Sequence, residues 1–195
     1  MVAVGTGLRE RKKVATRQAL HEAALALSIE HGLDRVTVEA IADAADVSRR
    51  TFSNYFASKE EALLYGDQQR VHALVDAVRA RPPAEPPWEA LTAAALEIQQ
   101  DLGARDPNWV NQVRLVRRHP ALAAYQVSTY AAMENELTAT VMARSAEPPI
   151  RARLMAAALL VAMRVAVQEW LDRERGTPLA TVMHETFTEM ATTFR

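Results

Sequence analysis

Eight residues, RPPAEPPW at 81–88, constrain the fold of this chain more than any other stretch. Four of them are prolines, which lack a main-chain N–H and clash with the preceding helical turn, so no helix runs through this segment. On both sides of it, apolar residues recur three and four positions apart, as they do in amphipathic helices. The sequence therefore predicts helices on either side of one sharp break.

Helical patterns account for most of the remaining sequence, and a capping residue, a glycine or a proline bounds each of them. A β-rich fold is not expected, because the chain has only 6 glycines and shows little of the alternating pattern of strands. We predict an all-α fold of about nine helices. The expected ranges are 16–31, 37–45, 48–55 and 58–78 before the break, then about 88–103, 107–118, 120–144, 149–175 and 178–194.

The composition excludes several classes of protein. Hydrophobic residues make up 49% and charged residues 24%, as in a soluble globular protein, and no cysteine is present for a disulfide or a thiolate zinc site. The start MVAVGTG lacks an apolar signal region. The longest apolar run, Leu154–Val167, is interrupted only by Arg164 and is shorter than the ~18–20 residues of a membrane span. We expect a cytoplasmic protein without a membrane segment.

Motifs for catalysis or cofactor binding are missing from the sequence. The five histidines have no metal-ligand spacing, no glycine-rich phosphate loop occurs, and no nucleophile can be paired with a base. We expect no enzymatic activity, no metal and no cofactor.

The first 17 residues are strongly basic although the whole chain carries a net charge of −1. Five basic residues accompany a single acidic one, Glu10, which gives +4 and leaves −5 for residues 18–195. A basic N-terminal arm at residues 1–15 suits contact with a DNA backbone. A frayed, solvated terminus is the alternative interpretation of the same charges.

Residues 37–56 meet the physical demands of a helix-turn-helix. Thr37 and Ser48 are expected to cap two short helices joined by a tight turn at Asp46–Val47. Phe52 and Phe56 lie four positions apart and can face a core together. A second helix of this size fits a major groove about 12 Å wide, where arginine can pair with guanine and asparagine with adenine. The side chains that point outward are Arg49, Arg50, Ser53 and Asn54.

The stretch TRQALHEAALALSIEHGLDRVTVEAIADAADVSRRTFSNYFASKEEAL, residues 16–63, resembles the DNA-binding domain of the tetracycline-repressor (TetR) family of bacterial transcription regulators. The resemblance lies in ALALSIEHGL, TVEAIADAADVS, the T-F-x-x-Y-F run and SKEEAL, and it covers about a quarter of the chain. It implies a helix-turn-helix domain at 16–60, a helical ligand-binding and dimerisation domain at 61–195, and a homodimer on a palindromic double-stranded DNA operator.

Two positions depart from the commonest family pattern. Asp46 stands where glycine is frequent in the turn, and aspartate tolerates the left-handed conformation better than most residues. Ser53 stands where many members have tyrosine, which can shift a contact onto Asn54 or Tyr55. For Arg49 and Arg50, base contact and phosphate contact both stay open, and Tyr55 can instead belong to the core. The residues expected to contact DNA are Arg11, Lys12, Lys13, Thr16, Arg17, Thr37, Ser48, Arg49, Arg50, Thr51, Ser53, Asn54, Tyr55 and Lys59.

Methionine and aromatic residues after the break suit an adaptable apolar ligand site, with core packing as the alternative for most of them. The expected lining residues are Leu64, Ile98, Trp109, Val113, Tyr125, Thr129, Met133, Leu159 and Met163. A further resemblance, in RTFSNYFASKE and RLVRRHPAL, is to an actinobacterial subgroup that includes regulators of mycofactocin type, some responsive to acyl-coenzyme A thioesters. It implies a ligand of that kind or another apolar metabolite. Arg114, Arg117 or Arg118 would then meet a ligand phosphate, unless they form a solvated face.

The last two helical patterns predict a dimer interface. The segment 154–167 is apolar on nearly every side, and the final pattern carries a regular apolar stripe. Two such helices can pair with their copies as a four-helix bundle around a two-fold axis. The residues expected in the interface are Leu154, Ala158, Val161, Val165, Val182, Met183, Phe187 and Met190.

We therefore predict a homodimeric DNA-binding regulator, a repressor that a small apolar or amphipathic ligand releases from its operator. A transcriptional activator of the same fold is one alternative. A helical adaptor that binds a partner protein through its last two helices is another.

Overall fold

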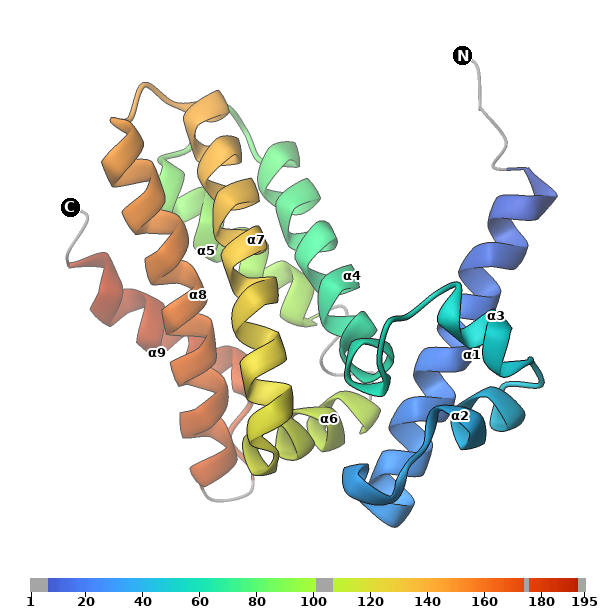
Figure 1. The fold of residues 1–195 in the computed structure, drawn as a ribbon. Helices are drawn as coiled ribbons and strands as arrows, with labels where there is room; N and C mark the ends of the chain where they lie inside the picture. The colour runs from blue at the N-terminus through green and yellow to red at the C-terminus, as the bar shows by residue number, and fades with distance from the viewer. Residues whose placement is uncertain (1–6, 101–106, 174–175, 193–195) are drawn as a thin grey trace. The chain divides into compact units, whose positions relative to one another are not determined.

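The computed structural model describes residues 7–100, 107–173 and 176–192, and every regular element within these ranges is helical. The all-α fold predicted from the sequence is confirmed. None of the described helices is long and apolar enough to cross a membrane. The elements (Figure 1) are α1 (Leu8–His31), the 3-10 turn η1 (Leu33–Arg35), α2 (Val38–Ala44), α3 (Arg49–Ser53), α4 (Lys59–Ala80), α5 (Pro87–Ile98), α6 (Pro107–Arg118), α7 (Pro120–Arg144), α8 (Pro149–Asp172) and α9 (Leu179–Ala191).

Most helices lie where the sequence predicts them because local signals set their ends. Proline occupies the first position of α5, α6, α7 and α8, where its missing N–H removes no helical hydrogen bond. α6 and α7 begin and end at the predicted residues. α5 ends at Ile98 and α9 at Ala191, and the ends predicted near 103 and 194 lie outside the described residues.

The start of α1 was predicted wrongly. The helix begins at Leu8, and Thr16, the expected N-cap, lies inside it and donates its Oγ1 hydrogen to the carbonyl of Lys12 at 2.9 Å. The helix extends because the added residues are mostly leucine, arginine, glutamate and lysine, all strong helix formers. The segment predicted as a basic arm is therefore helical from Leu8 onward.

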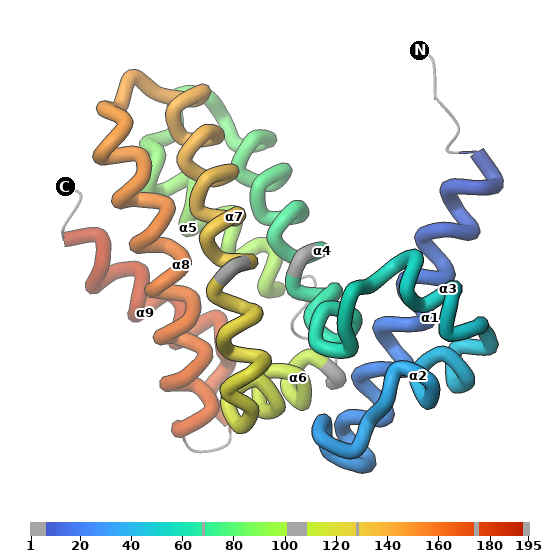
Figure 2. The backbone as a smooth tube through the Cα atoms, in the orientation of Figure 1, coloured from blue at the N-terminus to red at the C-terminus, as the bar shows by residue number. Residues whose placement is uncertain are grey.

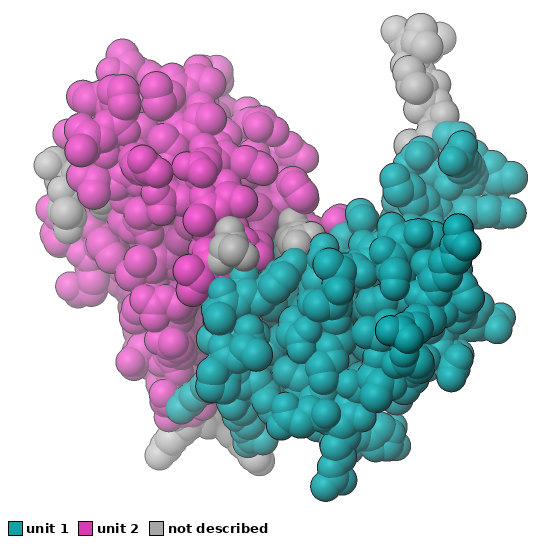
Figure 3. Space-filling model, in the orientation of Figure 1, with its two compact units in different colours: residues 1–68, 108–126 teal, residues 69–107, 127–195 magenta. Residues whose placement is uncertain are grey.

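The chain forms two compact units, which Figure 3 colours separately. Unit 1 comprises residues 1–68 and 108–126, and unit 2 comprises residues 69–107 and 127–195. α4 and α7 each contribute residues to both units. Unit 1 is larger than the helix-turn-helix domain expected at 16–60 because Leu122 of α7 is buried in the same core, with residues of α6 packed against that core.

The core of unit 1 joins α1, α2, α3 and the start of α4. Leu20, Ile41 and Leu63 are fully buried, and Phe52 is nearly so. The rings of Phe52 and Phe56 lie with centroids 5.9 Å apart, so the two phenylalanines share one face as predicted. This cluster anchors α3 from beneath and leaves its opposite face outside the core.

The turn between α2 and α3 forms as the sequence predicts. Thr37 accepts a hydrogen bond from the N–H of Ala40 at 3.1 Å, and Ser48 accepts one from the N–H of Thr51 at 3.0 Å. Asp46 has φ 54°, the left-handed conformation expected for it. α3 ends at Ser53, two residues before the predicted end, and Tyr55 N–H then bonds the carbonyl of Phe52 at 2.8 Å.

Unit 2 is organised around α8 and α9, which run side by side and both pack against α5 (Figure 2). Met155, Leu159 and Ala162 bury one face of α8. The other face carries Leu154 and Val161, which are 56% and 43% exposed. α8 therefore presents an uncovered apolar stripe in the single chain.

Candidate nucleic-acid interface

α3 presents polar side chains outward over a buried aromatic base. Arg49, Arg50, Ser53 and Asn54 are exposed, Thr51 is half-buried, and Phe52 beneath them is buried. Ser53 Oγ donates to the carbonyl of Arg49 at 3.2 Å, so its hydroxyl is turned toward its own helix. The remaining side chains have the size and polarity of groups that read base edges or phosphates.

The two arginines of α3 differ in their surroundings. Arg49 Nη1 lies 3.0 Å from Glu39 Oε1 of α2, in an exposed ion pair. Arg50 makes no ion pair with any residue that the structure describes. The guanidinium of Arg50 is therefore available to a partner outside the chain. The guanidinium of Arg49 can bind such a partner only if it gives up its ion pair with Glu39 or keeps both contacts at once.

Arg17 is held against the core of unit 1. Its guanidinium carbon lies 5.4–5.9 Å from the ring centroids of Tyr55, Phe56 and Tyr65, within range of cation–π attraction. Its Nη2 also donates to the carbonyl of Tyr55 at 3.4 Å. Arg17 is half-buried, and these contacts connect α1 to the segment after α3. Tyr55 is half-buried in the same group.

Lys59 is also engaged within unit 1. Its Nζ donates to the carbonyl of Leu33 at 2.8 Å and to that of Val36 at 2.9 Å. Both carbonyls belong to the segment that leads into α2. The ammonium group thus ties the start of α4 to this segment, where the sequence suggested only a phosphate contact.

The cap of α4 and a buried histidine complete the scaffold. Ser58 Oγ accepts from the N–H of Glu61 at 3.1 Å, and the carboxylate of Glu61 accepts from the N–H of Ala57 at 2.6 Å, so the two side chains form a capping box that reaches one residue before Ser58. His21 Nδ1 lies 2.9 Å from the carbonyl of Ala62, joining α1 to α4. His21 was not among the residues predicted from the sequence, since only its position on the apolar side of α1 indicated burial.

The basic residues of the predicted arm lie along α1. Arg11, Lys12 and Lys13 are exposed on its first turns. They belong to the basic arm predicted at residues 1–15, which is helical from Leu8 onward. Charges of this kind act on a phosphate backbone without reading its sequence.

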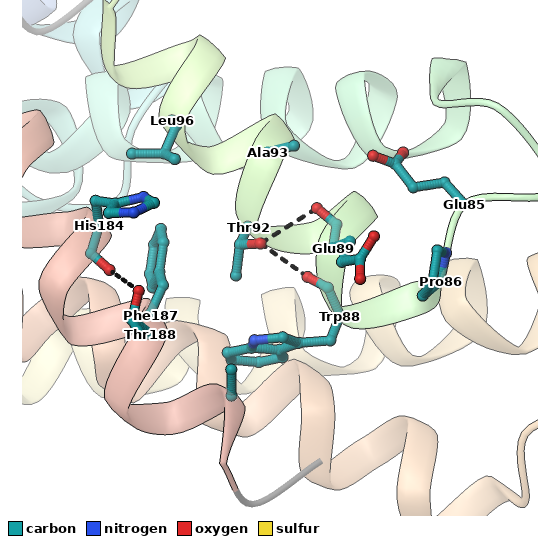
Figure 4. Close-up of a pocket in the computed structure, with 11 residues that line it drawn as sticks. Glu85, Pro86, Trp88, Glu89, Thr92, Ala93, Leu96, His184, Phe187 and Thr188 are labelled. Carbon is teal, nitrogen blue, oxygen red and sulfur yellow. Dashed lines mark hydrogen bonds between the residues drawn. The ribbon is translucent and has the colours of Figure 1, made fainter. Parts of the chain in front are cut away.

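The nine residues expected around a ligand are divided between the two units. Leu64, Trp109, Val113 and Tyr125 belong to unit 1, and the others belong to unit 2. Among them, Leu64, Trp109, Met133 and Leu159 are buried. The described pocket of unit 2 instead lies between α5 and α9 (Figure 4), and none of these nine residues lines it.

The eight residues expected at a dimer interface also fall into two groups. On α8, Leu154 and Val161 are exposed, and Ala158 and Val165 are half-buried. On α9, Met190 is half-buried. The remaining three, Val182, Met183 and Phe187, are buried within the single chain.

An all-α chain that presents an exposed, arginine-bearing second helix of a helix-turn-helix belongs to the class of DNA-binding transcriptional regulators. Comparison with known proteins gives the family. The model described as bacterial regulatory proteins of the tetR family matches residues 20–65, and that of the MftR C-terminal domain matches residues 85–195. This chain belongs to the tetR family of bacterial regulatory proteins, whose members are ligand-responsive, DNA-binding regulators.

Individual relatives agree with this assignment. The HTH-type transcriptional regulator TcmR of Streptomyces glaucescens is 33% identical over 178 residues, which cover 87% of this chain and 79% of TcmR. MftR of Mycobacterium tuberculosis, described as a proposed mycofactocin biosynthesis regulator, is 29% identical over 139 residues, covering 69% of this chain and 68% of MftR. The solved structure of Thermus thermophilus FadR with lauroyl-CoA has a TM-score of 0.59 at 21% identity, covering 90% and 93% of the two chains, and shares the fold.

Proposed function

We propose that this regulator is a repressor that binds a palindromic operator as a homodimer and leaves it when a small apolar or amphipathic ligand binds. The observation that carries the proposal is the exposed face of α3, where Arg50 and Asn54 stand over the buried Phe52. A DNA-binding regulator needs no catalytic step, and we propose the cytoplasm as the place where it acts.

Within the helix-turn-helix, we assign base reading to Arg50 and Asn54. Arginine can donate two hydrogen bonds to guanine, and asparagine can both donate to and accept from adenine. Arg49 can join them once it leaves Glu39. Thr37, Ser48, Thr51 and Tyr55, together with the basic residues of α1, would contact phosphates and orient the helix.

Arg17 and Lys59 receive a different role in this proposal. Both donate hydrogen bonds to main-chain carbonyls of unit 1. We propose that they hold the helix-turn-helix in shape and act on DNA through it. Their removal should therefore lower stability before it changes the number of phosphate contacts.

We propose that the exposed stripe of α8 joins two copies of the chain. Leu154 and Val161 lie seven positions apart, on one face of the helix, with Ile150 four positions before Leu154. Two copies of an apolar helical face can form an isologous, two-fold contact. Such a dimer would present two α3 helices to successive major grooves about 34 Å apart.

The proposed ligand is an acyl-coenzyme A or another apolar metabolite. Support comes from FadR, a structural relative that was solved with lauroyl-CoA, and from the match to the MftR C-terminal domain. A ligand that binds the free form more tightly than the operator-bound form shifts the population away from DNA. Moving the balance from 1:99 to 99:1 needs a preference of about 10⁴-fold.

A gel-shift titration tests the proposal on DNA from upstream of the regulator's own gene and of neighbouring genes. We expect sequence-specific binding that weakens steeply as salt rises, because phosphate contacts release counterions. Addition of lauroyl-CoA should release the DNA. Binding that shows no sequence preference on any of these fragments would contradict the proposal.

A further inference from the structure

A pocket of about 530 Å³ lies between α5 and α9, and all of its lining residues belong to unit 2. Its lining includes the apolar side chains of Trp88, Leu96 and Phe187. Trp88 and Phe187 are only 8% and 4% exposed, so their rings are fixed by packing. Figure 4 shows both rings close to Thr92 at the centre of the pocket. The volume is within the ~300–1,000 Å³ range of small-molecule sites.

The hydroxyl groups in this pocket are already used by their own helices. Thr92 Oγ1 donates to the carbonyls of Trp88 and Glu89, at 3.0 and 3.2 Å. Thr188 Oγ1 donates to the carbonyl of His184 at 2.8 Å. A ligand therefore meets the carboxylate of Glu89 and the imidazole of His184 as the main polar groups.

Two glutamates line the pocket, and they differ in their ion pairs: Glu85 is paired with Arg81, and Glu89 is not. Arg81 donates to both carboxylate oxygens of Glu85, at 2.8 and 2.6 Å, and this hydrogen bonding holds the pKa of Glu85 below its usual range. Glu89 has no ion-pair partner among the residues that the structure describes. The side chain of Glu89 thus leaves a negative charge at the edge of an aromatic pocket.

The wider charge pattern has the same sign. Arg81 also lies 3.9 Å from Glu97, and Arg144 acts on Glu85 as well, so Glu85, Glu89 and Glu97 stand against two arginines, and +2 − 3 gives −1. Glu85 precedes α5, Glu89 lies in its first turn and Glu97 near its end, and of the three only Glu85 and Glu89 line the pocket. This potential favours a cation and disfavours an anion such as a carboxylate.

We propose that the α5–α9 pocket is a second small-molecule site, which binds an organic cation with a flat aromatic or apolar body. The body packs against Trp88 and Phe187, whose ring faces attract a cation, and the cationic group lies beside Glu89. All of its lining residues belong to unit 2, and the proposal does not depend on the proposed repressor function. Its ligand differs in charge from an acyl-coenzyme A.

Isothermal titration of the full-length protein with benzyltrimethylammonium, at low salt and without DNA, tests the site. We expect saturable binding that weakens at high salt, with no binding of benzoate, whose charge is opposite. Glu89→Gln should weaken binding about fivefold, because an exposed carboxylate contributes modestly. Glu136→Gln, an exposed change on α7 outside the pocket, is the matched control and should bind like the wild type.

A second variant fills the pocket. Ala93 lines it and is half-buried, so Ala93→Met should occupy part of the volume and abolish binding while the circular dichroism spectrum stays helical. Absence of binding to the wild type would overturn the proposal, including the case in which a second copy of the chain covers the pocket. Equal binding by the wild type and Glu89→Gln, or binding of benzoate, would overturn it as well. Because the titration contains no DNA, its outcome is separate from that of the gel shift.

Discussion

Arg50 and Asn54 carry the most specific expectation about single residues. Arg50→Ala and Asn54→Ala should each lose about 1–3 kcal/mol of operator binding at one base pair, because a bidentate contact discriminates by that much. Binding to a set of operators with each base pair changed in turn measures the loss. Arg79→Ala on α4, in unit 2, is the control and should leave the pattern unchanged. Equal weakening on every sequence would assign Arg50 to phosphate.

For Lys59 we expect the opposite result: its substitution should lower the stability of the fold and leave the salt dependence of DNA binding unchanged. Lys59→Met removes the only charged donor to the carbonyls of Leu33 and Val36 within the described residues, which should cost about 1–3 kcal/mol. Thermal unfolding should then begin several degrees lower, since ~1 kcal/mol corresponds to ~2–4 °C for a domain of this size. Lys13→Met, an exposed change on α1, should leave the melting temperature as it is. A Lys59→Met protein of normal stability, whose salt slope falls by one unit, would restore the phosphate role.

Residue roles were predictable where the partner lies nearby in sequence. Thr37 and Ser48 cap helices by bonding N–H groups three positions on, so the sequence predicts both contacts. Arg17 and Lys59 bond carbonyls that lie 38 and 26 positions away, which depends on how α1, α3 and α4 pack. For them the sequence indicated a charge near the expected DNA site and could not indicate its partner.

Among the elements, the turn between α2 and α3 requires a left-handed backbone conformation at Asp46, and substitutions there can test this requirement. Asp46 adopts φ 54°, a conformation that costs most non-glycine residues about 1–2 kcal/mol. Asp46→Gly should raise the melting temperature by about 1–3 °C, since glycine reaches this conformation freely but loses more chain entropy on folding. Asp46→Val should lower it, because β-branched residues fit the region worst. A melting temperature that rises in Asp46→Val would show that the turn changes its conformation.

The end of α4 depends on one arginine of α7. Arg144 donates to the carbonyls of Val78, Arg81 and Pro82, each at 2.8 Å, all within unit 2. Arg144→Leu should destabilise this junction by about 2 kcal/mol or more, because the carbonyls lose a charged donor. Hydrogen exchange in the last turn of α4 should then speed up. Arg79→Leu loses only an exposed pair with Asp76 and should change exchange there little.

Helix boundaries were predictable where a proline, a glycine or a capping residue marks the end of the helix in the sequence. α7 begins at Pro120 and ends at Arg144 as expected, because proline favours the first helical position and the segment from Ser145 to Pro149 stops the helix. α1 lacked such a signal at its true start. Thr16 resembles an N-cap in sequence, yet the strong helix formers before it continue the helix to Leu8.

At the scale of the whole molecule, the sequence predicted the fold class and family but not the division into units. The break at 81–88 separates α4 from α5 as expected, yet it lies wholly inside unit 2. α6 and the first residues of α7 join unit 1 because Leu122 packs into the core around Phe52 and Leu63. Such pairing between distant segments leaves no periodic trace in the sequence, and the α5–α9 pocket arises in the same way.

We propose that the uncovered stripe of α8 joins two copies of the chain, and operator binding tests this proposal. Leu154→Glu or Val161→Glu puts a charge on an exposed position, so the single chain should still fold, but a two-fold apolar contact would bury two such charges. We expect light scattering to report a monomer and gel shifts to report operator affinity reduced by at least about 10²-fold, because two linked readers gain that much over one. Val127→Glu, an exposed apolar position on α7, is the matched control and should leave a dimer. A Leu154→Glu protein that remains dimeric and keeps its operator affinity would mean that another surface joins the copies, and the assignment of α8 to the interface would be wrong.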